Sequence, residues 1–367
     1  MSAHADRPAP DAPATTAVTF GLDTFGDVTV DSHGNPLPMH QVLRDVLEEA
    51  VVADRAGVDH FSVGEHHRPD FAVSAPDVVL AAAAARTDRI TLGSAVTVLS
   101  SDDPIRVYER FATIDAISGG RAEITVGRGS FIESFPLFGF ALEDYEVLFE
   151  EKLDLLVRLR EEGPVTWSGS TRAPLTGGRV FPTTARGSLP VWVGVGGSPQ
   201  SVVRAAGHGL PMMLAIIGGS PDRFRPFVDL FHRAVHELHG HAGPSPLPVG
   251  VHSPGFVAET DHEALDLLYP HYRAMRDRIG RERGWPPLTR AEYEQEAATG
   301  ALFVGSPETV ARRIAETVRT LGVQRFDLKY ANGAMPHKLL VRAVELYGSE
   351  VIPRVRELLA AEVASGT

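Results

Sequence analysis

Short apolar runs rich in β-branched residues alternate with helical patterns along most of the chain. These runs predict strands at Val18–Leu22, His60–Val63, Ile90–Val98, Ala122–Val126, Val191–Val195, Met212–Ile216, Val249–Val257 and Phe326–Lys329. Several of the runs are apolar almost throughout, which is typical of parallel strands that are covered on both faces. The pattern therefore predicts an α/β fold built on a parallel sheet.

Helix signals fill the segments between these strands. After the first strand, apolar residues recur at helical spacing and Gly57 follows at the position of a C-terminal cap; the recurring residues are Val42, Val46, Ala50 and Ala53. Four further helix starts have a capping side chain followed by proline, at Asp103, Ser198, Ser220 and Ser306. Eight strand and helix units close most economically into a (β/α)₈ TIM barrel, and an open doubly wound sheet is the alternative.

Two connections are too long for plain loops of such a barrel. Segment 163–190 is rich in Gly, Pro and Thr and predicts an inserted loop or hairpin after a helix over Glu143–Glu162. Segment 258–305 contains charged helical patterns near Asp261–Arg283 and Ala291–Ala298. Because neither segment has the apolar periodicity of its own core, we expect one barrel domain over 18–367 with two insertions. Residues 1–17, rich in Pro and Ala, predict a disordered tail.

Composition narrows the chemistry. The chain has no cysteine, which excludes disulfide scaffolds, iron–sulfur clusters, cysteine-bound zinc and a thiol nucleophile. Its 35 Lys and Arg against 47 Asp and Glu argue against binding to nucleic acid or to an anionic membrane surface. No secretory signal or run of spanning length stands out, so we expect a cytoplasmic protein that acts on small molecules.

Two histidines follow the second predicted strand, in the sequence Glu65-His66-His67. Catalytic groups of a barrel gather at the carboxyl ends of its strands, so this position suits an acid or base. Adjacent residues on a strand point to opposite faces, which disfavours a metal site that uses both histidines. On the residues alone, an acid/base role and simple packing or solvation of the two histidines remain equally open.

Three glycine-containing segments mark places where a ligand can approach the backbone. Gly93–Ala95 puts small residues in the third strand, where a planar ligand or a crowded barrel interior requires them. Arg128 stands between Gly127 and Gly129 just past the fourth strand, and a guanidinium suits phosphate or carboxylate. Gly196–Ser198 leads into a proline-capped helix whose N-terminus can bind phosphate, although an ordinary turn has the same sequence.

The order of these motifs resembles the luciferase-like flavin monooxygenase family. The resemblance runs from Thr19 to Leu359 and rests on EHH, the Pro-Ile-Arg after the third strand, GRGS with ESFPLFG, VWVGVGGSP with GLPMML, and GSPETVARRIAETVRTLGVQRFDL. It implies a (β/α)₈ barrel with insertions that binds FMN, or in some branches the deazaflavin F420. It makes His66 an acid/base or a stabiliser of the peroxyflavin and Glu65 the residue that orients His66.

The resemblance also implies the cofactor contacts. Ala95 and Val96 match a pair joined by a non-proline cis peptide that supports the flavin ring, with Thr97 beside them. Arg128 and Gly129 match the phosphate contact of the family. The donors opposite are assigned to Gly196, Gly197 and Ser198, and no metal is implied. Luciferases themselves carry a cysteine in place of Gly127, an acidic residue in place of Gly196 and a tryptophan absent from the MLAII segment, which argues against light emission on a long aldehyde.

The resulting hypothesis is a homodimeric monooxygenase that takes reduced FMN from a separate flavin reductase. Reduced FMN and O₂ would oxidise a small organic substrate through a C4a-peroxyflavin. One alternative is an F420-dependent hydride-transfer oxidoreductase of the same fold, and another is a flavin-binding protein without turnover. On the residues alone, a metal-dependent barrel hydrolase that uses His66 or His67 remains a further alternative.

Overall fold

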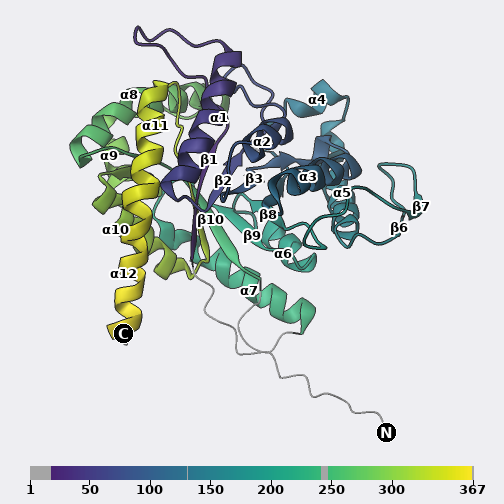
Figure 1. Cartoon of the computed structure of the whole chain (residues 1–367). Coiled ribbons are helices and arrows are strands. Elements are labelled where there is room, and N and C mark those ends of the chain that lie inside the picture. The colour runs from purple at the N-terminus through teal and green to yellow at the C-terminus, as the bar shows by residue number, and fades with distance from the viewer. Residues whose placement is uncertain (1–17, 130, 241–246, 366–367) are drawn as a thin grey trace.

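The centre of the molecule is a closed ring of parallel strands (Figure 1). The computed structural model describes residues 18–129, 131–240 and 247–365, so the tail predicted over 1–17 lies outside the described residues. Going round the ring, the strands are β1 (Thr19–Thr24), β2 (His60–Val63), β3 (Thr91–Ser94), β5 (Ala122–Gly127), β8 (Val191–Val195), β9 (Met212–Ala215), β10 (Val249–Val257) and β12 (Arg325–Lys329). Neighbours pair in parallel, and β12 pairs with β1. The predicted barrel is confirmed, and the open sheet is wrong.

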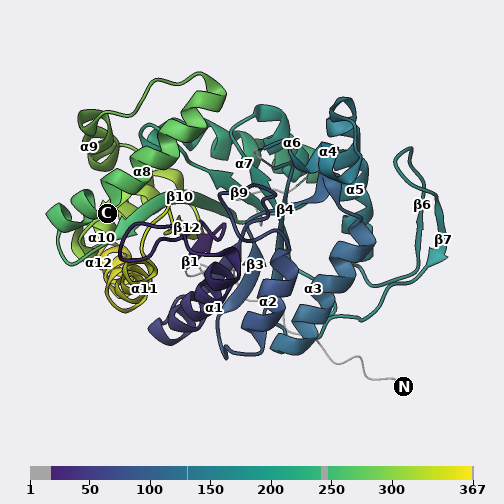
Figure 2. The same cartoon turned by 90° about the horizontal axis from the view of Figure 1, so that it is seen from above.

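Helices surround this ring (Figure 2). They are α1 (Met39–Ala56), α2 (Pro76–Ala84), α3 (Pro104–Ser118), α5 (Tyr145–Leu159), α6 (Pro199–Gly207), α7 (Arg225–His239), α10 (Pro307–Leu321), α11 (His337–Leu346) and α12 (Ile352–Ser365), with a π-helical turn, η4 (Tyr347–Val351), between the last two. The apolar face predicted for α1 is buried, and Gly57 ends that helix with φ 91°. No helix within the described ranges is long and apolar enough to cross a membrane.

Three of the four predicted caps form. The side chains of Asp103, Ser198 and Ser306 accept hydrogen bonds from backbone N–H groups in the first turns of α3, α6 and α10. At Ser220 the prediction of a capped α-helix is wrong, because the side chain makes no cap and the chain enters a 3₁₀ turn, η3 (Pro221–Phe224). The reason is Pro226, whose missing N–H would break an α-helix that continued from Pro221, so α7 starts at Arg225.

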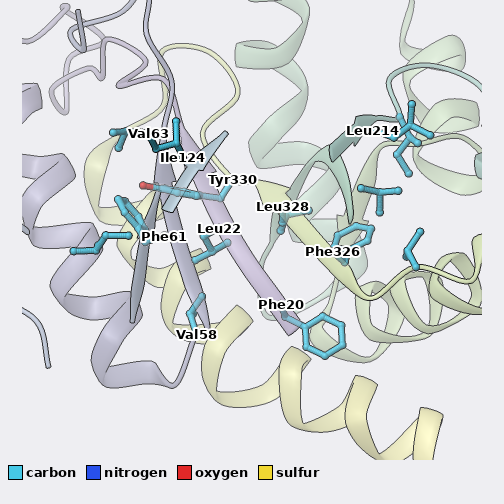
Figure 3. Packing of buried hydrophobic residues seen from close by; sticks show 14 of the residues in the cluster. Phe20, Leu22, Val58, Phe61, Val63, Ile124, Leu214, Phe326, Leu328 and Tyr330 are labelled. Atoms are coloured by element: carbon cyan, nitrogen blue, oxygen red, sulfur yellow. The ribbon is translucent and has the colours of Figure 1, made fainter. Parts of the chain in front are cut away.

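Alternation along the strands separates the core from the barrel interior (Figure 3). Outward side chains such as Phe20, Phe61, Ile124 and Phe326 are buried in the hydrophobic layer that the strands share with the helices. The intervening residues include charged side chains at the bottom of the barrel, where Arg325 donates hydrogen bonds to Asp327 at 2.9 Å and to Glu123. Burial disfavours ionisation of Glu123, but the charges of Arg325 and His60 outweigh it and lower the pKa of Glu123 below its ordinary value.

The two long connections lie on different parts of the barrel. Between β5 and β8 the chain forms α4 (Ser134–Phe138), a 3₁₀ turn η2 (Leu142–Asp144), α5, and an antiparallel hairpin of β6 (Val165–Trp167) and β7 (Leu175–Gly178) that projects from one side (Figures 1 and 2). Between β10 and β12 it forms α8 (Asp261–Arg283), α9 (Arg290–Thr299) and β11 (Phe303–Gly305), which pairs with β10 outside the ring. In Figure 1, α4 and α8 lie at the end of the barrel opposite the C-terminus.

Candidate functional site

A cavity of about 280 Å³ opens at the carboxyl ends of the barrel strands. Its wall includes Asp23 of β1, Thr125 of β5, Met213 of β9 and Asp327 of β12. The predicted site residues that line it are Glu65, His66, Ala95, Val96, Arg128, Gly129 and Gly196. Because active sites of TIM barrels lie at this end, the cavity is the candidate site. It is called the barrel-mouth cavity below.

His66 lies among aromatic rings just beyond β2. Its ring centroid is 4.6 Å from that of Phe25, 4.6 Å from that of Phe71 and 5.4 Å from that of Phe131. Burial lowers the pKa of His66 to about 3, and the positive charges of Lys329 and Arg68 act in the same direction. The imidazole is therefore neutral at physiological pH and has one donor and one acceptor nitrogen.

Glu65 does not hold His66 directly. Its Oε1 lies 3.0 Å from Nε2 of His67, and its Oε2 accepts the backbone N–H of Val98 at 2.9 Å. The structure shows no hydrogen bond between Glu65 and His66, and the role of Glu65 in orienting His66 stays a prediction. Glu65 instead fixes His67, which packs edge-on against Phe138, and ties the end of β2 to the chain that follows β3.

The third barrel strand is interrupted at the cavity. The Ala95–Val96 peptide bond is cis, as the resemblance implied, and the strand resumes as β4 (Thr97–Val98), which pairs with β5. Ala95 and Val96 line the cavity, whereas Thr97 is buried behind it. The Thr97 hydroxyl has no hydrogen-bond partner among the described residues. Thr97 does not line the cavity, and its contact with a cofactor stays a prediction.

Two glycines give Val96 room to lie across the cavity wall. A Cβ added to Gly127 would lie 2.7 Å from Cγ2 of Val96, and one added to Gly194 would lie 2.9 Å from Cγ1. Val96 therefore occupies the space that a side chain at Gly127 requires. A cysteine at position 127 would collide with Val96 in this structure.

Arg128 forms a polar end to the cavity on the side of β5 and β8. Its Nη2 donates to the hydroxyl of Ser201 at 3.1 Å, its Nη1 pairs with Glu146, and its guanidinium lies 4.9 Å from the ring centroid of Tyr145. Ser201 belongs to the first turn of α6, where backbone N–H groups and the helix dipole favour an anion. This arrangement suits a phosphate group that is shared between Arg128, Ser201 and the helix.

Of the three predicted donors Gly196, Gly197 and Ser198, one lines the cavity and the other two do not. Gly196 lines the cavity, and a Cβ there would meet nothing within 4 Å, so this position is open. Gly197 and Ser198 are not among the lining residues. Gly197 turns the chain with φ 93°, and the Ser198 hydroxyl caps α6 and lies 2.8 Å from that of Ser201. Ser201, which the sequence pattern does not single out, therefore faces Arg128 in their place.

Asp23 and His252 form a pair that sequence reasoning missed. Nδ1 of His252 lies 2.8 Å from Oδ2 of Asp23, and both residues line the barrel-mouth cavity. Burial opposes ionisation of His252, but the charge and hydrogen bond of Asp23 outweigh it and raise the pKa of His252. The signal available in the sequence is a single histidine within the otherwise uncharged strand Val249–Val257.

The described residues do not support the metal-dependent alternative. His66 is surrounded by phenylalanines and His67 is engaged by Glu65, so the two do not converge on one point. The group of potential ligands found in the described part of the chain is Asp45, Glu48 and His337, which lies on α1 and α11 away from the cavity.

A flavin-type cofactor fits the barrel-mouth cavity on three observations. Arg128 and Ser201 supply donors for a phosphate on the side of β5 and β8. Gly196 lines the cavity and an added Cβ there would meet nothing within 4 Å, so this part of the wall leaves space for a flat ring. Across the ring of strands, Oδ1 of Asp23 is buried without a hydrogen-bond partner among the described residues, and it can accept an N–H or O–H of the ligand.

Comparison with known proteins identifies the family of the chain. The profile described as luciferase-like monooxygenase matches residues 18–325, so the chain belongs to this family of monooxygenases and related oxidoreductases. It is 28% identical to 4-hydroxyprotoasukamycin monooxygenase of Streptomyces nodosus subsp. asukaensis, over 87% of this chain and 85% of that protein. It is 24% identical to an alkanal monooxygenase alpha chain of Photorhabdus luminescens, over 91% of this chain and 97% of the relative.

Solved structures share the fold. Monooxygenase RslO1 from Streptomyces bottropensis has a TM-score of 0.77 and 22% identity, with 91% of this chain and 99% of that chain covered. The oxygenating constituent of 3,6-diketocamphane monooxygenase from Pseudomonas putida, in complex with FMN, has a TM-score of 0.74 and 18% identity over 92% and 99%. The F420-dependent tetrahydromethanopterin reductase from Methanopyrus kandleri has a TM-score of 0.67 and 20% identity over 92% and 99%.

Proposed function

We propose that the protein is an FMN-dependent monooxygenase that oxidises a small organic molecule with O₂. The observation that carries the proposal is the pairing of Arg128 with Ser201 at the first turn of α6, across the cavity from the unpartnered Oδ1 of Asp23. This arrangement supports binding of a phosphate and of a polar ring in one cavity. The monooxygenase names of its relatives and the FMN in the Pseudomonas putida structure support the same function.

Reduced FMN, when bound, supplies the electrons that activate O₂. The residues of this chain bind it and shield it. Arg128 and Ser201 would hold the phosphate, and the backbone at Ala95 and Val96 would face the ring. Phe25 lines the cavity, and Phe71 and Phe131 pack against His66, so this histidine has apolar surroundings that would keep water away from the reacting atoms.

The two histidines of the cavity would have different tasks. His66 is neutral because its pKa is about 3, so it would hold an oxygen atom of the reaction by a hydrogen bond and not as a cation. His252 donates Nδ1–H to Asp23, and the raised pKa favours the imidazolium, which carries a second proton on Nε2. We propose that this second proton is the one delivered to the oxygen atom that leaves as water.

An F420-dependent oxidoreductase is the second candidate. The structural relative from Methanopyrus kandleri uses coenzyme F420, and the phosphate contacts described for Arg128 and Ser201 suit either cofactor. The two functions differ in their use of oxygen, because hydride transfer to or from F420 requires none.

Isotope labelling tests the proposed function. The protein is supplied with reduced FMN, ¹⁸O₂ and a panel of organic acids, ketones and aromatic compounds, and products are analysed by mass spectrometry. One ¹⁸O atom per product molecule is expected. His66→Ala is expected to lower product yield about a hundredfold while FMN affinity is retained. His67→Ala, which changes the neighbouring histidine outside the aromatic cluster, serves as the matched control.

Products that form with F420 and contain no ¹⁸O would contradict the FMN-dependent monooxygenase. FMN binding without any product would indicate a flavin-binding protein without turnover. An unchanged yield in His66→Ala would remove the role given to His66.

The electron donor and the assembly stay predictions. A separate flavin reductase is expected to supply reduced FMN, and the chain is expected to form a homodimer. Product formation that depends on an added reductase and NAD(P)H tests the first. Sedimentation of the full chain tests the second.

A further inference from the structure

A second cavity of about 580 Å³ adjoins the barrel-mouth cavity. The two share Phe25, Ile217 and His252 as a common wall. The volume lies within the range of small-molecule sites, and the position is next to the proposed reaction centre. Because it is covered by α8 and α9 of the 258–305 insertion, it is called the insertion cavity below. Segment 163–190 lines neither cavity.

One face of α8 forms the cover of the insertion cavity. Its lining residues follow helical spacing, at Tyr272, Met275, Arg276, Ile279 and Arg283. The helix is tied down at its edge by ion pairs from Arg278 to Asp70 and from Glu282 to Arg68. These contacts join α8 to the loop that carries Phe71, so the cover and the aromatic wall form one connected structure.

Five aromatic side chains contribute to the remaining wall. Phe25, Phe71, Phe131, Trp285 and Tyr293 come from five separate segments of the chain and line the same space. Aromatic side chains give large contact areas and favour planar, apolar ligands.

Arg276 is a charged residue of this wall with an unused hydrogen-bond donor. Its guanidinium lies 4.2 Å from the ring centroid of Trp285, and its Nη1 is buried without a hydrogen-bond partner among the described residues. No ion pair joins it to a carboxylate in the described part of the chain. A buried guanidinium N–H of this kind is costly unless an acceptor reaches it, and a carboxylate is the acceptor that its geometry fits best.

The other charged groups of the wall already have partners. Arg283 is engaged, and its guanidinium lies 5.3 Å from the ring centroid of Trp285. Glu292 accepts from the backbone N–H and hydroxyl of Thr289 in a capping box, and Glu296 accepts from the backbone N–H groups of Gly219 and Ala301. Lys329 pairs with Asp27 at 3.0 Å. Neither Glu292 nor Glu296 accepts a hydrogen bond from Arg276, so Nη1 of Arg276 is left to donate to a ligand.

We propose that the insertion cavity binds the substrate and that the substrate is an aromatic carboxylate. The rings of the wall would hold its aromatic part next to the shared wall, and Arg276 would bind its carboxylate. This assignment rests on the proposed function for the step of oxidation, but binding itself requires neither FMN nor turnover.

Calorimetric titration of the full chain with two matched probes tests this assignment. 2-Naphthoate carries the carboxylate at about pH 8, and 2-naphthamide has the same rings without charge. Naphthoate is expected to bind about tenfold or more tightly than the amide, and more tightly than octanoate, which has a carboxylate but no ring. Arg276→Met should remove the preference for naphthoate over the amide and leave amide binding within about twofold, and Arg276→Lys should restore part of the preference.

Arg281→Met is the control, because Arg281 is an exposed arginine of the same helix that does not line the cavity. Ile279→Trp, which fills the cavity, should weaken both naphthyl probes. Equal binding of the two probes, no saturable binding, or a preference that survives in Arg276→Met would overturn the assignment. If naphthoate is preferred through Arg276 but no ¹⁸O-labelled product forms, the substrate assignment stands and the proposed monooxygenase function is contradicted. If labelled product forms but Arg276 gives no preference, the function stands and the substrate assignment is contradicted.

Discussion

Nδ1 of His252 on β10 lies 2.8 Å from Oδ2 of Asp23 on β1, although 229 residues separate them in the chain. The pair stands in the wall of the barrel-mouth cavity, and His252 also lines the insertion cavity. Asp327 adds negative charge and Lys329 adds positive charge nearby, and the balance raises the pKa of His252. The pair therefore places a proton donor between the proposed cofactor and the proposed substrate.

The Asp23–His252 pair predicts a pH dependence. Without substrate, the protein-bound anion of reduced FMN (FMNH⁻), O₂ and one proton give oxidised FMN and H₂O₂. The reoxidation rate is expected to fall as pH rises through the raised pKa of His252, because the imidazolium loses its proton. His252→Gln should lower the rate about a hundredfold near pH 6 and flatten the profile. Stopped-flow absorbance of oxidised FMN measures the rate.

Asp23→Asn is the companion variant for this profile. It removes the charge that raises the pKa of His252, so burial then dominates and the fall in rate should move to lower pH. A profile that does not move, or that is unchanged in His252→Gln, would show that this pair does not deliver the proton.

The phosphate end of the site predicts opposite effects of two substitutions. Arg128→Met should weaken FMN binding about tenfold or more, because the guanidinium that donates to Ser201 would also bind the phosphate. Glu146→Gln should strengthen FMN binding, since it removes the negative charge paired with Arg128. Fluorescence titration with FMN and with riboflavin measures both effects. Riboflavin lacks the phosphate and should be nearly indifferent to either change; equal losses for both ligands would place the phosphate elsewhere.

Packing at Gly127 predicts a coupled pair of substitutions. Gly127→Ala puts a Cβ 2.7 Å from Cγ2 of Val96, and such overpacking costs about 1–3 kcal/mol of the free energy of unfolding. Val96→Ala removes the opposing atoms, so Gly127→Ala should cost less in that background. Gly196→Ala, with nothing within 4 Å of the added atom, is the control. Urea unfolding measures each variant, and strictly additive effects would contradict the contact.

A buried carboxyl outside the cavity predicts a pH-dependent stability. Burial raises the pKa of Glu49 to about 8, although the hydrogen bond from Tyr330 opposes the change. Between the ordinary pKa of a glutamate and about 8, the folded state holds a proton on Glu49 that the unfolded state lacks. The free energy of unfolding of the protein therefore falls as pH rises through that window. Glu49→Gln should match the natural protein near pH 5 and unfold with roughly 2–4 kcal/mol more free energy near pH 9.

The exposed neighbour Glu48 supplies the control for this experiment. Glu48→Gln should leave most of the pH dependence of unfolding in place, because its carboxyl is exposed and its charge contributes least to the raised pKa of Glu49. If Glu49→Gln has the same pH dependence as the natural protein, the carboxyl of Glu49 is ionised in the folded state and the raised pKa is wrong.

The barrel strands are predictable from the sequence because burial of their outward faces leaves long apolar runs. β11 was missed, since Phe303–Gly305 is a three-residue strand that pairs with β10 alone and has no periodicity. The helix start at Ser220 was misread because the Ser-Pro pattern does not account for Pro226 five residues after Pro221. Local sequence patterns predict a helix or strand where a single strong pattern is present. They fail where the element is too short to have a pattern, as in β11, or where a second residue such as Pro226 changes the conformation.

The site divides in the same way. The sequence predicts which segments meet at the barrel mouth, because parallel strands all end there, and it locates His66 and Arg128 through their local motifs. It does not predict that Glu65 turns to His67, because that depends on the path of the chain beyond β2. Two features of the site are contacts between distant segments and depend on the register of the closed barrel: the Asp23–His252 pair and the hydrogen bond from Arg128 to Ser201. That Arg276 has no partner likewise depends on what the fold places around it.

An anaerobic titration tests whether the barrel mouth holds FMN. The protein is titrated with reduced FMN and, separately, with reduced F420, for the natural chain and for Arg128→Met. We expect saturable micromolar binding of FMN, weakened about tenfold or more by Arg128→Met, and much weaker binding of F420. Micromolar F420 binding with no affinity for FMN would contradict the proposed function.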